Sequence, residues 1–207
     1  MKLPAFLNSP RFLDRAEQVI VSILFLLLTQ RLWPESLSFS ELVPILVLIS
    51  EGIVVLFIIL RRPTDQISMR FSDWLLAAVG TFFALLAGPP GELFMPMLGI
   101  PILVMGICIH LGAKLSLNRS FGLVAANRGV RSSGLYLFVR HPMYSGYLAT
   151  YVGFLLVAPS LYNFVIYVIV AALLVGRIYA EERLLKEDEK YLDFSKQVRF
   201  RLVPGIF

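Results

Sequence analysis

The sequence predicts an all-α integral membrane protein with about six transmembrane helices. Three observations lead to this prediction. Of the 207 residues, 57% are hydrophobic and only 16% are charged, a balance that is unusual in soluble domains. Several apolar stretches approach the length of about 20 residues that a helix needs to cross a bilayer. The basic residues are also concentrated in alternate connections between these stretches, as in proteins that cross a membrane repeatedly.

Helix-breaking residues bound the apolar segments. The first segment ends at Trp33-Pro34, and the sequence GPPG at 88–91 closes the third. The fourth contains Pro96 and Pro101, which predict a kink. The expected spans are 16–32, 42–60, 72–87, 93–111, 142–157 and 161–179. Five spans are the alternative, since the proline-rich third and fourth segments could form one irregular element.

The distribution of Lys and Arg predicts the orientation. Apart from Arg31, every one of the 19 basic residues precedes the first span, lies in the second or fourth connection, or lies from Arg177 at the end of the last span onward. Basic connections remain in the cytoplasm, so both termini and the fourth connection are expected there.

Two regions follow from this organisation. Residues 1–111 are expected to form an N-terminal membrane region of four spans. Residues 112–207 would contain a basic connection, a helical hairpin with the three-residue turn 158–160, and a polar tail. In the tail, Leu184, Tyr191 and Val198 recur every seven residues, which predicts an amphipathic helix from Ala180 onward.

The most informative stretch is GLYLFVRHPMYSGY at 134–147. Pro142 favours the first turn of a helix, whose unpaired backbone N–H groups attract anions. Arg140 and His141 directly precede that turn and predict an anion-binding pocket at the membrane boundary. From these residues alone, a basic interfacial anchor with an aromatic belt is an equally good interpretation.

Motifs further along the chain favour the pocket. Arg177, Glu181 and Glu182 follow in an RxxxEE spacing, and Tyr191 and the sequence RLVP at 201–204 come after them. This ordered series resembles the isoprenylcysteine carboxyl methyltransferase and phospholipid methyltransferase families over about residues 112–207. One departure is Asp188-Glu189-Lys190 before Tyr191, where these families often have Phe-Gly.

The resemblance implies a methyltransferase that uses S-adenosyl-L-methionine at the cytosolic membrane face. It implies catalytic roles for Arg177 and Glu182. The implied cofactor contacts are Gly134, Tyr136, Arg140, His141, Tyr144, Glu181, Glu182 and Tyr191.

The chemistry of these side chains suits that cofactor. Arg140 and His141 can bind its carboxylate, and Glu181 and Glu182 can bind its ammonium group or ribose hydroxyls. Aromatic rings suit the adenine and the sulfonium. Without the surrounding motifs, Arg177 and Glu181 would be interpreted as an ordinary i,i+4 pair on a helix.

The acceptor class stays open at this stage. A lipophilic small molecule or a lipid-modified acceptor in contact with membrane lipid is expected, with no role for nucleic acid. The alternatives are a phospholipid, amine or thiol methyltransferase of the same fold, a steroid-reductase-like enzyme that uses NADPH, or a module that only binds anionic lipid. One cysteine and two histidines far apart in the sequence predict no metal site.

A few residues inside the spans are unusual. Placing the acidic side chain of Glu51 at membrane depth costs free energy. Glu51 is therefore expected either to have a functional role or to form a hydrogen bond to a neighbouring helix. For His110, an interfacial hydrogen bond is the preferred interpretation, and a role at a substrate entrance is the alternative. Gly146 and Gly153 are typical of close helix packing, although the small residues on this helix could also leave a lateral opening for a lipid.

Overall fold

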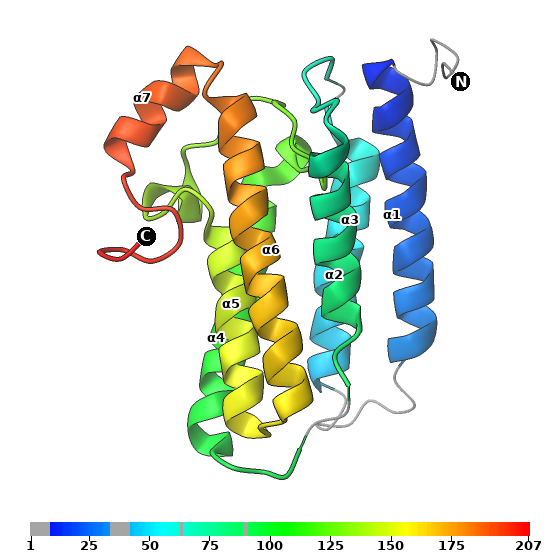
Figure 1. Ribbon diagram of the computed structural model, residues 1–207, viewed down its shortest axis with the longest axis vertical. Coiled ribbons are helices and arrows are strands. Elements are labelled where there is room, and N and C mark those ends of the chain that lie inside the picture. The colour runs from blue at the N-terminus through cyan, green and yellow to red at the C-terminus, as the bar shows by residue number, and fades with distance from the viewer. Residues whose placement is uncertain (1–8, 34–41, 63, 89–90) are drawn as a thin grey trace.

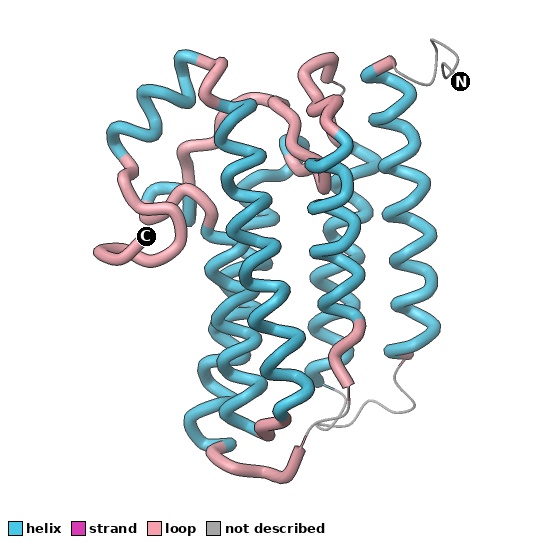
Figure 2. Tube along the Cα trace, in the orientation of Figure 1, coloured by secondary structure: helices cyan, strands magenta, loops and turns pink. Residues whose placement is uncertain are grey.

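In the computed structural model, residues 9–33, 42–62, 64–88 and 91–207 are described. They form seven α-helices and two short 3₁₀-helices (Figures 1 and 2). The helices are α1 (Pro10–Leu32), α2 (Leu42–Leu60), α3 (Phe71–Leu85), α4 (Pro96–Leu117), α5 (Pro142–Val157), α6 (Leu161–Leu185) and α7 (Glu189–Gln197). The 3₁₀-helices η3 (Asn118–Ser120) and η4 (Gly134–Leu137) lie in the connection between α4 and α5. Within these ranges the only strand-like pairing is an isolated bridge between Ile67 and Ala126.

The all-helical prediction is confirmed, and six long helices lie side by side in one bundle (Figure 1). The third and fourth segments do not form one irregular element, because α3 and α4 are separate helices. The side chain of Asn163 holds the linker between them: its Oδ1 accepts from Gly88 N at 2.9 Å and its Nδ2 donates to Gly88 O at 3.3 Å. Farther along the linker, Phe94 N donates to Val157 O at 2.9 Å.

Three helices differ from their predicted boundaries. α1 begins at Pro10, earlier than residue 16, because Ser9 caps it by accepting a hydrogen bond from Phe12 N. α4 begins at Pro96 rather than 93 and continues through Pro101 to Leu117. The predicted tail helix from Ala180 is wrong at its start, because residues 180–185 continue α6. The separate helix α7 follows Asp188, whose carboxylate caps it by accepting from Lys190 N.

Four glycines let α4 and α5 approach at backbone distance. A Cβ on Gly146 would lie 2.5 Å from His110 N, and one on Gly153 would lie 2.4 Å from Leu103 N. The facing glycines of α4, Gly99 and Gly106, are equally enclosed. The close-packing interpretation of Gly146 and Gly153 is therefore confirmed. A lateral opening at these glycines is ruled out, because the backbone of α4 fills that space.

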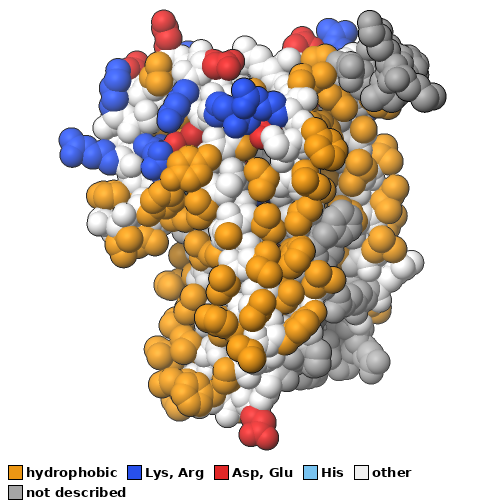
Figure 3. Space-filling view, viewed as in Figure 1, with side chains coloured by type: hydrophobic (Ala, Val, Ile, Leu, Met, Phe, Trp, Pro, Cys, Tyr) orange, Lys and Arg blue, Asp and Glu red, His pale blue; other side chains and the backbone are white. Residues whose placement is uncertain are grey.

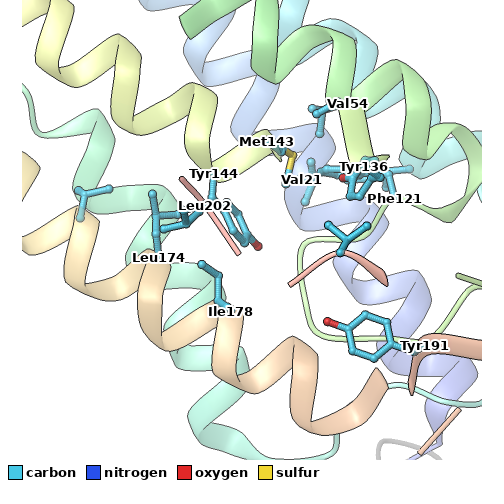
Figure 4. Packing of buried hydrophobic residues seen from close by; sticks show 14 of the residues in the cluster. Val21, Val54, Phe121, Tyr136, Met143, Tyr144, Leu174, Ile178, Tyr191 and Leu202 are labelled. Carbon is cyan, nitrogen blue, oxygen red and sulfur yellow. The ribbon is translucent and has the colours of Figure 1, made fainter. Parts of the chain in front are cut away.

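One hydrophobic core joins the N-terminal and C-terminal parts of the chain. Val21 of α1 and Val54 of α2 belong to the same buried cluster as Tyr136, Tyr144 and Ile178 (Figure 4). The expected boundary between 1–111 and 112–207 falls inside the continuous helix α4. Both parts therefore contribute to the environment of the site.

The bundle has a charged end and an apolar body. Most Lys, Arg, Asp and Glu side chains in this view gather at the end that carries α7 and the α4–α5 connection. Hydrophobic side chains predominate over the described body of the bundle, with an acidic group at the opposite end (Figure 3). Among the described residues, Pro96–Ser120 and Leu161–Leu185 are long and apolar enough to cross a membrane. Exposed side chains such as Leu161, Phe164 and Val168 on α6 suit contact with lipid rather than water.

The glycine contacts predict the effect of enlarging Gly153. We expect Gly153→Leu to destabilise the protein in detergent by about 1–3 kcal/mol or more, because added carbons in a full interface force the helices apart. Val152→Leu is the matched control, since Val152 is exposed on the same helix and should tolerate the change. Thermal unfolding monitored by circular dichroism measures both. Equal melting temperatures for the two variants would contradict the packing assignment.

Candidate functional site

An open cavity lies at the charged end of the bundle, between the α4–α5 connection, the start of α5, the end of α6 and α7. It contains about 780 Å³ of space, its mouth included. Its polar lining includes Ser120, Arg128, Arg131, Arg140, His141, Tyr144, Glu181 and Tyr191. The connection and the tail therefore share this end of the molecule, as the sequence predicts.

Backbone hydrogen bonds join the RHP motif to the tail. Arg140 N donates to Phe200 O at 2.9 Å, and His141 N donates to Arg201 O at 2.8 Å. Ser145 on the first turn of α5 donates its hydroxyl proton to Leu202 O at 2.6 Å. These contacts explain why the two motifs, about 60 residues apart in the sequence, meet at one place.

Glu182 is the ionic centre of this junction. Arg201 binds its carboxylate with both Nε and Nη2, at 3.0 and 2.9 Å. Arg140 Nε donates to Oε1 at 2.9 Å, and His141 Nε2 lies 3.3 Å from the same oxygen. Glu182 is 1% exposed and does not line the cavity. The carboxylate of Glu182 was expected to contact the cofactor. In the structure it is bound by Arg140 and His141 of the RHP motif and by Arg201 of the tail.

Glu181 points to the cavity instead. Its carboxylate accepts a hydrogen bond from Tyr144 Oη, and its Oε2 lies 3.6 Å from His141 Nδ1. The rings of His141 and Tyr144 stack with their centroids 5.9 Å apart. One anionic group thus lies beside two aromatic rings on the cavity wall.

The remaining predicted residues divide between the cavity and its supports. Tyr136 and Tyr191 line the cavity, and both are buried (Figure 4). Gly134 does not line it. Its φ of +62° suits glycine, and a Cβ there would lie 2.5 Å from Ser116 Oγ, so it shapes the start of η4 against α4.

Arg177 lies behind the cavity wall. Its Nη2 donates to Leu123 O at 2.8 Å, and its guanidinium carbon lies 5.4 Å from the centre of the Tyr144 ring. It therefore touches the cavity through Tyr144, and its charge is buried next to the groups that line the site.

Sequence reasoning missed the basic residues that the connection contributes. Arg128 and Arg131 line the cavity, and the side chain of Arg128 is fully buried. Nε and Nη1 of Arg128 have no hydrogen-bond partner among the described residues. The only sequence signal for this role is a basic and turn-rich composition, which is also typical of a solvated loop.

A second missed feature is a buried ionic network that joins α1 to the end of α2 and to the connection. Arg61 Nη2 lies 2.6 Å from Asp14 Oδ1, and Arg61 Nη1 lies 2.9 Å from Glu17 Oε2. Arg128 also binds Asp14. Asp14 precedes the expected first span and Glu17 is its second residue, and charges at the end of a span are usually solvated.

The predictions for Glu51 and His110, the two unusual residues inside the helices, have different outcomes. Glu51 forms an ion pair with Lys114 Nζ of α4 at 2.6 Å, which confirms its interaction with a neighbouring helix. The expected interfacial hydrogen bond of His110 is not found. This side chain is 5% exposed, neither ring nitrogen has a partner among the described residues, and the ring contacts Tyr147 edge-on at 4.8 Å.

Comparison with known proteins identifies the region that carries these motifs. Residues 97–187 match the model of the isoprenylcysteine carboxyl methyltransferase (ICMT) family. The match covers less than half of the 207 residues, and it shows that this region is similar to that family. The resemblance predicted from RHPMY and RxxxEE is thereby confirmed, and so is the assignment as a membrane-embedded methyltransferase of the ICMT type. The match ends at residue 187, so Tyr191 and the RLVP segment at 201–204 lie outside it.

The chain is also similar to a solved structure of a eukaryotic intramembrane Ras methyltransferase ICMT. The two share 18% identity, with 97% of this chain and 71% of that chain covered and a TM-score of 0.49. No curated protein sequence matches the chain. Among the residues that the structure describes, no group of three His, Cys, Asp or Glu side chains could hold a metal ion.

The environment of His141 predicts how stability depends on pH. Burial lowers the pKa of His141, but hydrogen bonds to Glu181 and Glu182 outweigh burial and raise this pKa above its usual value. The charged pair therefore contributes its full stability below the unfolded-state value of about pH 6.5, and loses it as the pH rises through the raised folded-state pKa.

We accordingly expect the free energy of unfolding of the wild type to fall relative to His141→Gln as the pH rises above about 6.5. Thermal unfolding of both proteins in detergent between pH 5 and pH 9 measures the difference. A constant difference over this range would show that His141 does not carry the charge.

Proposed function

We propose that this membrane methyltransferase uses S-adenosyl-L-methionine and transfers the methyl group to a lipophilic or lipid-modified acceptor. The observation that supports this most strongly is the convergence of the RHP motif, Glu181 and the basic connection on one cavity. The cofactor supplies an electrophilic methyl group on a sulfonium centre. The cavity offers groups of the right chemistry for each of its parts.

The residues on the cavity wall fit the charges of this cofactor. Arg128 has buried N–H groups that lack a hydrogen-bond partner among the described residues, and with Arg131 and Arg140 it can bind a carboxylate. Glu181 can bind an ammonium group or ribose hydroxyls. Tyr136, Tyr144 and Tyr191 offer aromatic faces to adenine and to a cationic sulfur.

We assign different roles to Arg177 and Glu182, the two residues expected to be catalytic. Arg177 is buried beside Tyr144, and we assign it the orientation of an anionic acceptor near the reacting groups. Glu182 is a positioning residue, because Arg140, His141 and Arg201 already occupy its carboxylate. A carboxylate acceptor needs no general base, so the chain has to supply orientation and exclusion of water.

The proposal includes the orientation in the membrane. Six spans with both termini and the cavity in the cytoplasm follow from the basic residues. The ends of α2, α4 and α6 lie together at the charged end of the bundle (Figure 1), which is consistent with this orientation. A water-soluble cofactor would then reach the cavity from the cytosol, while the acceptor stays in the bilayer.

Titration with S-adenosylhomocysteine tests the cofactor assignment. We expect saturable binding to the wild type and a loss of about one to two decades in affinity for His141→Ala and Glu181→Gln, because charge-assisted contacts contribute about 1.5–3 kcal/mol. Asp193→Asn removes only an exposed pair on α7 and is the control. Calorimetric binding of a reduced nicotinamide instead of S-adenosylhomocysteine would replace this proposal with a reductase.

Product analysis tests the acceptor. We expect transfer of isotope-labelled methyl groups to N-acetyl-S-farnesylcysteine, with Arg177→Lys slower in kcat because it cannot keep the planar guanidinium geometry. Mass spectrometry of the products also identifies labelled compounds in a native lipid extract. If only phospholipid amines or thiols are labelled, the carboxylate acceptor is wrong although the methyltransferase assignment stands.

Cysteine labelling tests the orientation. In a Cys108→Ser background, we expect cysteines at Asn127 and Lys196 to react with an impermeant reagent from the cytoplasmic side only. Cysteines at Gly91 and Ser160 should react only from the other side. Labelling of Gly91 and Asn127 from one side would show that α4 does not cross the membrane.

A further inference from the structure

Glu17 of α1 contacts the wall of the cavity from outside the region that matches the ICMT family. Its side chain is 1% exposed. Its Oε1 accepts two backbone hydrogen bonds, from Leu123 N and from Val124 N, the second at 3.1 Å. Val124 lines the cavity. A carboxylate on α1 therefore holds the backbone of the connection where the connection forms the wall.

The opposite side of the same residue is held by Arg177. The carbonyl oxygen of Leu123 accepts from Arg177 Nη2 at 2.8 Å. The N–H and the C=O of Leu123 thus bind Glu17 and Arg177 respectively. Arg177 in turn lies over Tyr144, whose hydroxyl donates to Glu181 in the cavity. A continuous series of contacts leads from α1 to the candidate reacting groups.

Burying the carboxylate of Glu17 costs desolvation free energy, which argues for a role beyond packing. Burying a carboxylate requires a partner, and Arg61 Nη1 provides one at 2.9 Å. Arg61 and Arg128 are both fully buried and also bind Asp14. A hydrophobic contact could join α1 to the connection at lower cost, but it would leave the two N–H groups of Leu123 and Val124 without an acceptor.

We propose that Glu17 is a positioning residue of the methyl-transfer site. It holds the Leu123–Val124 backbone so that Leu123 O keeps Arg177 beside Tyr144 and Val124 keeps the cavity wall in place. This inference rests on the proposed function for the role of Arg177. It assigns part of the site to α1, which precedes the family-matched residues 97–187.

Amide hydrogen exchange of the protein without ligand tests the contact itself. We expect Glu17→Ala to lose protection at Leu123 and Val124 by at least tenfold, because their acceptor is removed. Glu17→Gln keeps an acceptor oxygen and should retain most of the protection. Asp73→Asn is the control, since Asp73 is a buried carboxylate that pairs with the partly exposed Arg183, and neither residue lines the cavity. Unchanged exchange in Glu17→Ala overturns the proposal.

Ligand binding then separates positioning from stability. Glu17→Ala, Glu17→Gln and Asp73→Asn each weaken an ion pair, so all three should lower the melting temperature. Only Glu17→Ala should also weaken S-adenosylhomocysteine binding, by about tenfold or more, and lower kcat with N-acetyl-S-farnesylcysteine. An affinity that falls in step with the melting temperature in all three variants shows a merely structural role and overturns the proposal.

The two experiments also distinguish this proposal from the proposed function. If the wild type does not bind S-adenosylhomocysteine, the cofactor assignment fails, and with it the role of Glu17 in methyl transfer. The exchange measurement needs no ligand, so it still decides whether Glu17 holds the wall. If the wild type binds but Glu17→Ala binds equally well, the proposed function stands and the role of Glu17 fails.

Discussion

The site depends on the buried carboxylate of Glu182. Four side-chain N–H groups or ring nitrogens from Arg140, His141 and Arg201 lie within 3.3 Å of its oxygens. Glu182 lies near the end of α6, Arg140 and His141 precede α5, and Arg201 lies in the tail, so a single anion joins three parts of the chain. Losing this carboxylate would leave the two arginines without their anionic partner, which costs more than the loss of one contact.

The position of the cavity follows from this junction together with the seam between α4 and α5. The four glycines bring α4 and α5 to backbone distance, which fixes where α5 begins relative to the connection that follows α4. The junction at Glu182 then places α6 and the tail against the first turn of α5. Side chains at the charged end line the space that remains, and the apolar body below it is free to contact lipid.

Three networks that hold buried charges in the described part of the chain have different surroundings. Glu182 and its partners support the RHP motif, Asp14 and Glu17 with Arg61 and Arg128 tie α1 to the connection, and Glu51 pairs with Lys114 between α2 and α4. Each network joins segments that are far apart in the sequence. Because every one of these groups has an opposite charge near it, the protein can keep ions at depths where an isolated charge would be unstable.

The sequence by itself determined the all-helical class, the positions of most long helices and the motif-bearing end, because hydropathy, proline breaks and basic residues act locally along the chain. It also identified Tyr136, Arg140, His141, Tyr144, Glu181 and Tyr191, which line the cavity. Only the tertiary structure decided that Arg140, His141 and Arg201 pair with Glu182, that α6 continues past Ala180, and that Asp14 and Glu17 meet the basic residues of the α4–α5 connection. These features depend on contacts between segments that are far apart in the sequence. Neither the spacing nor the composition of the residues shows which segments will meet.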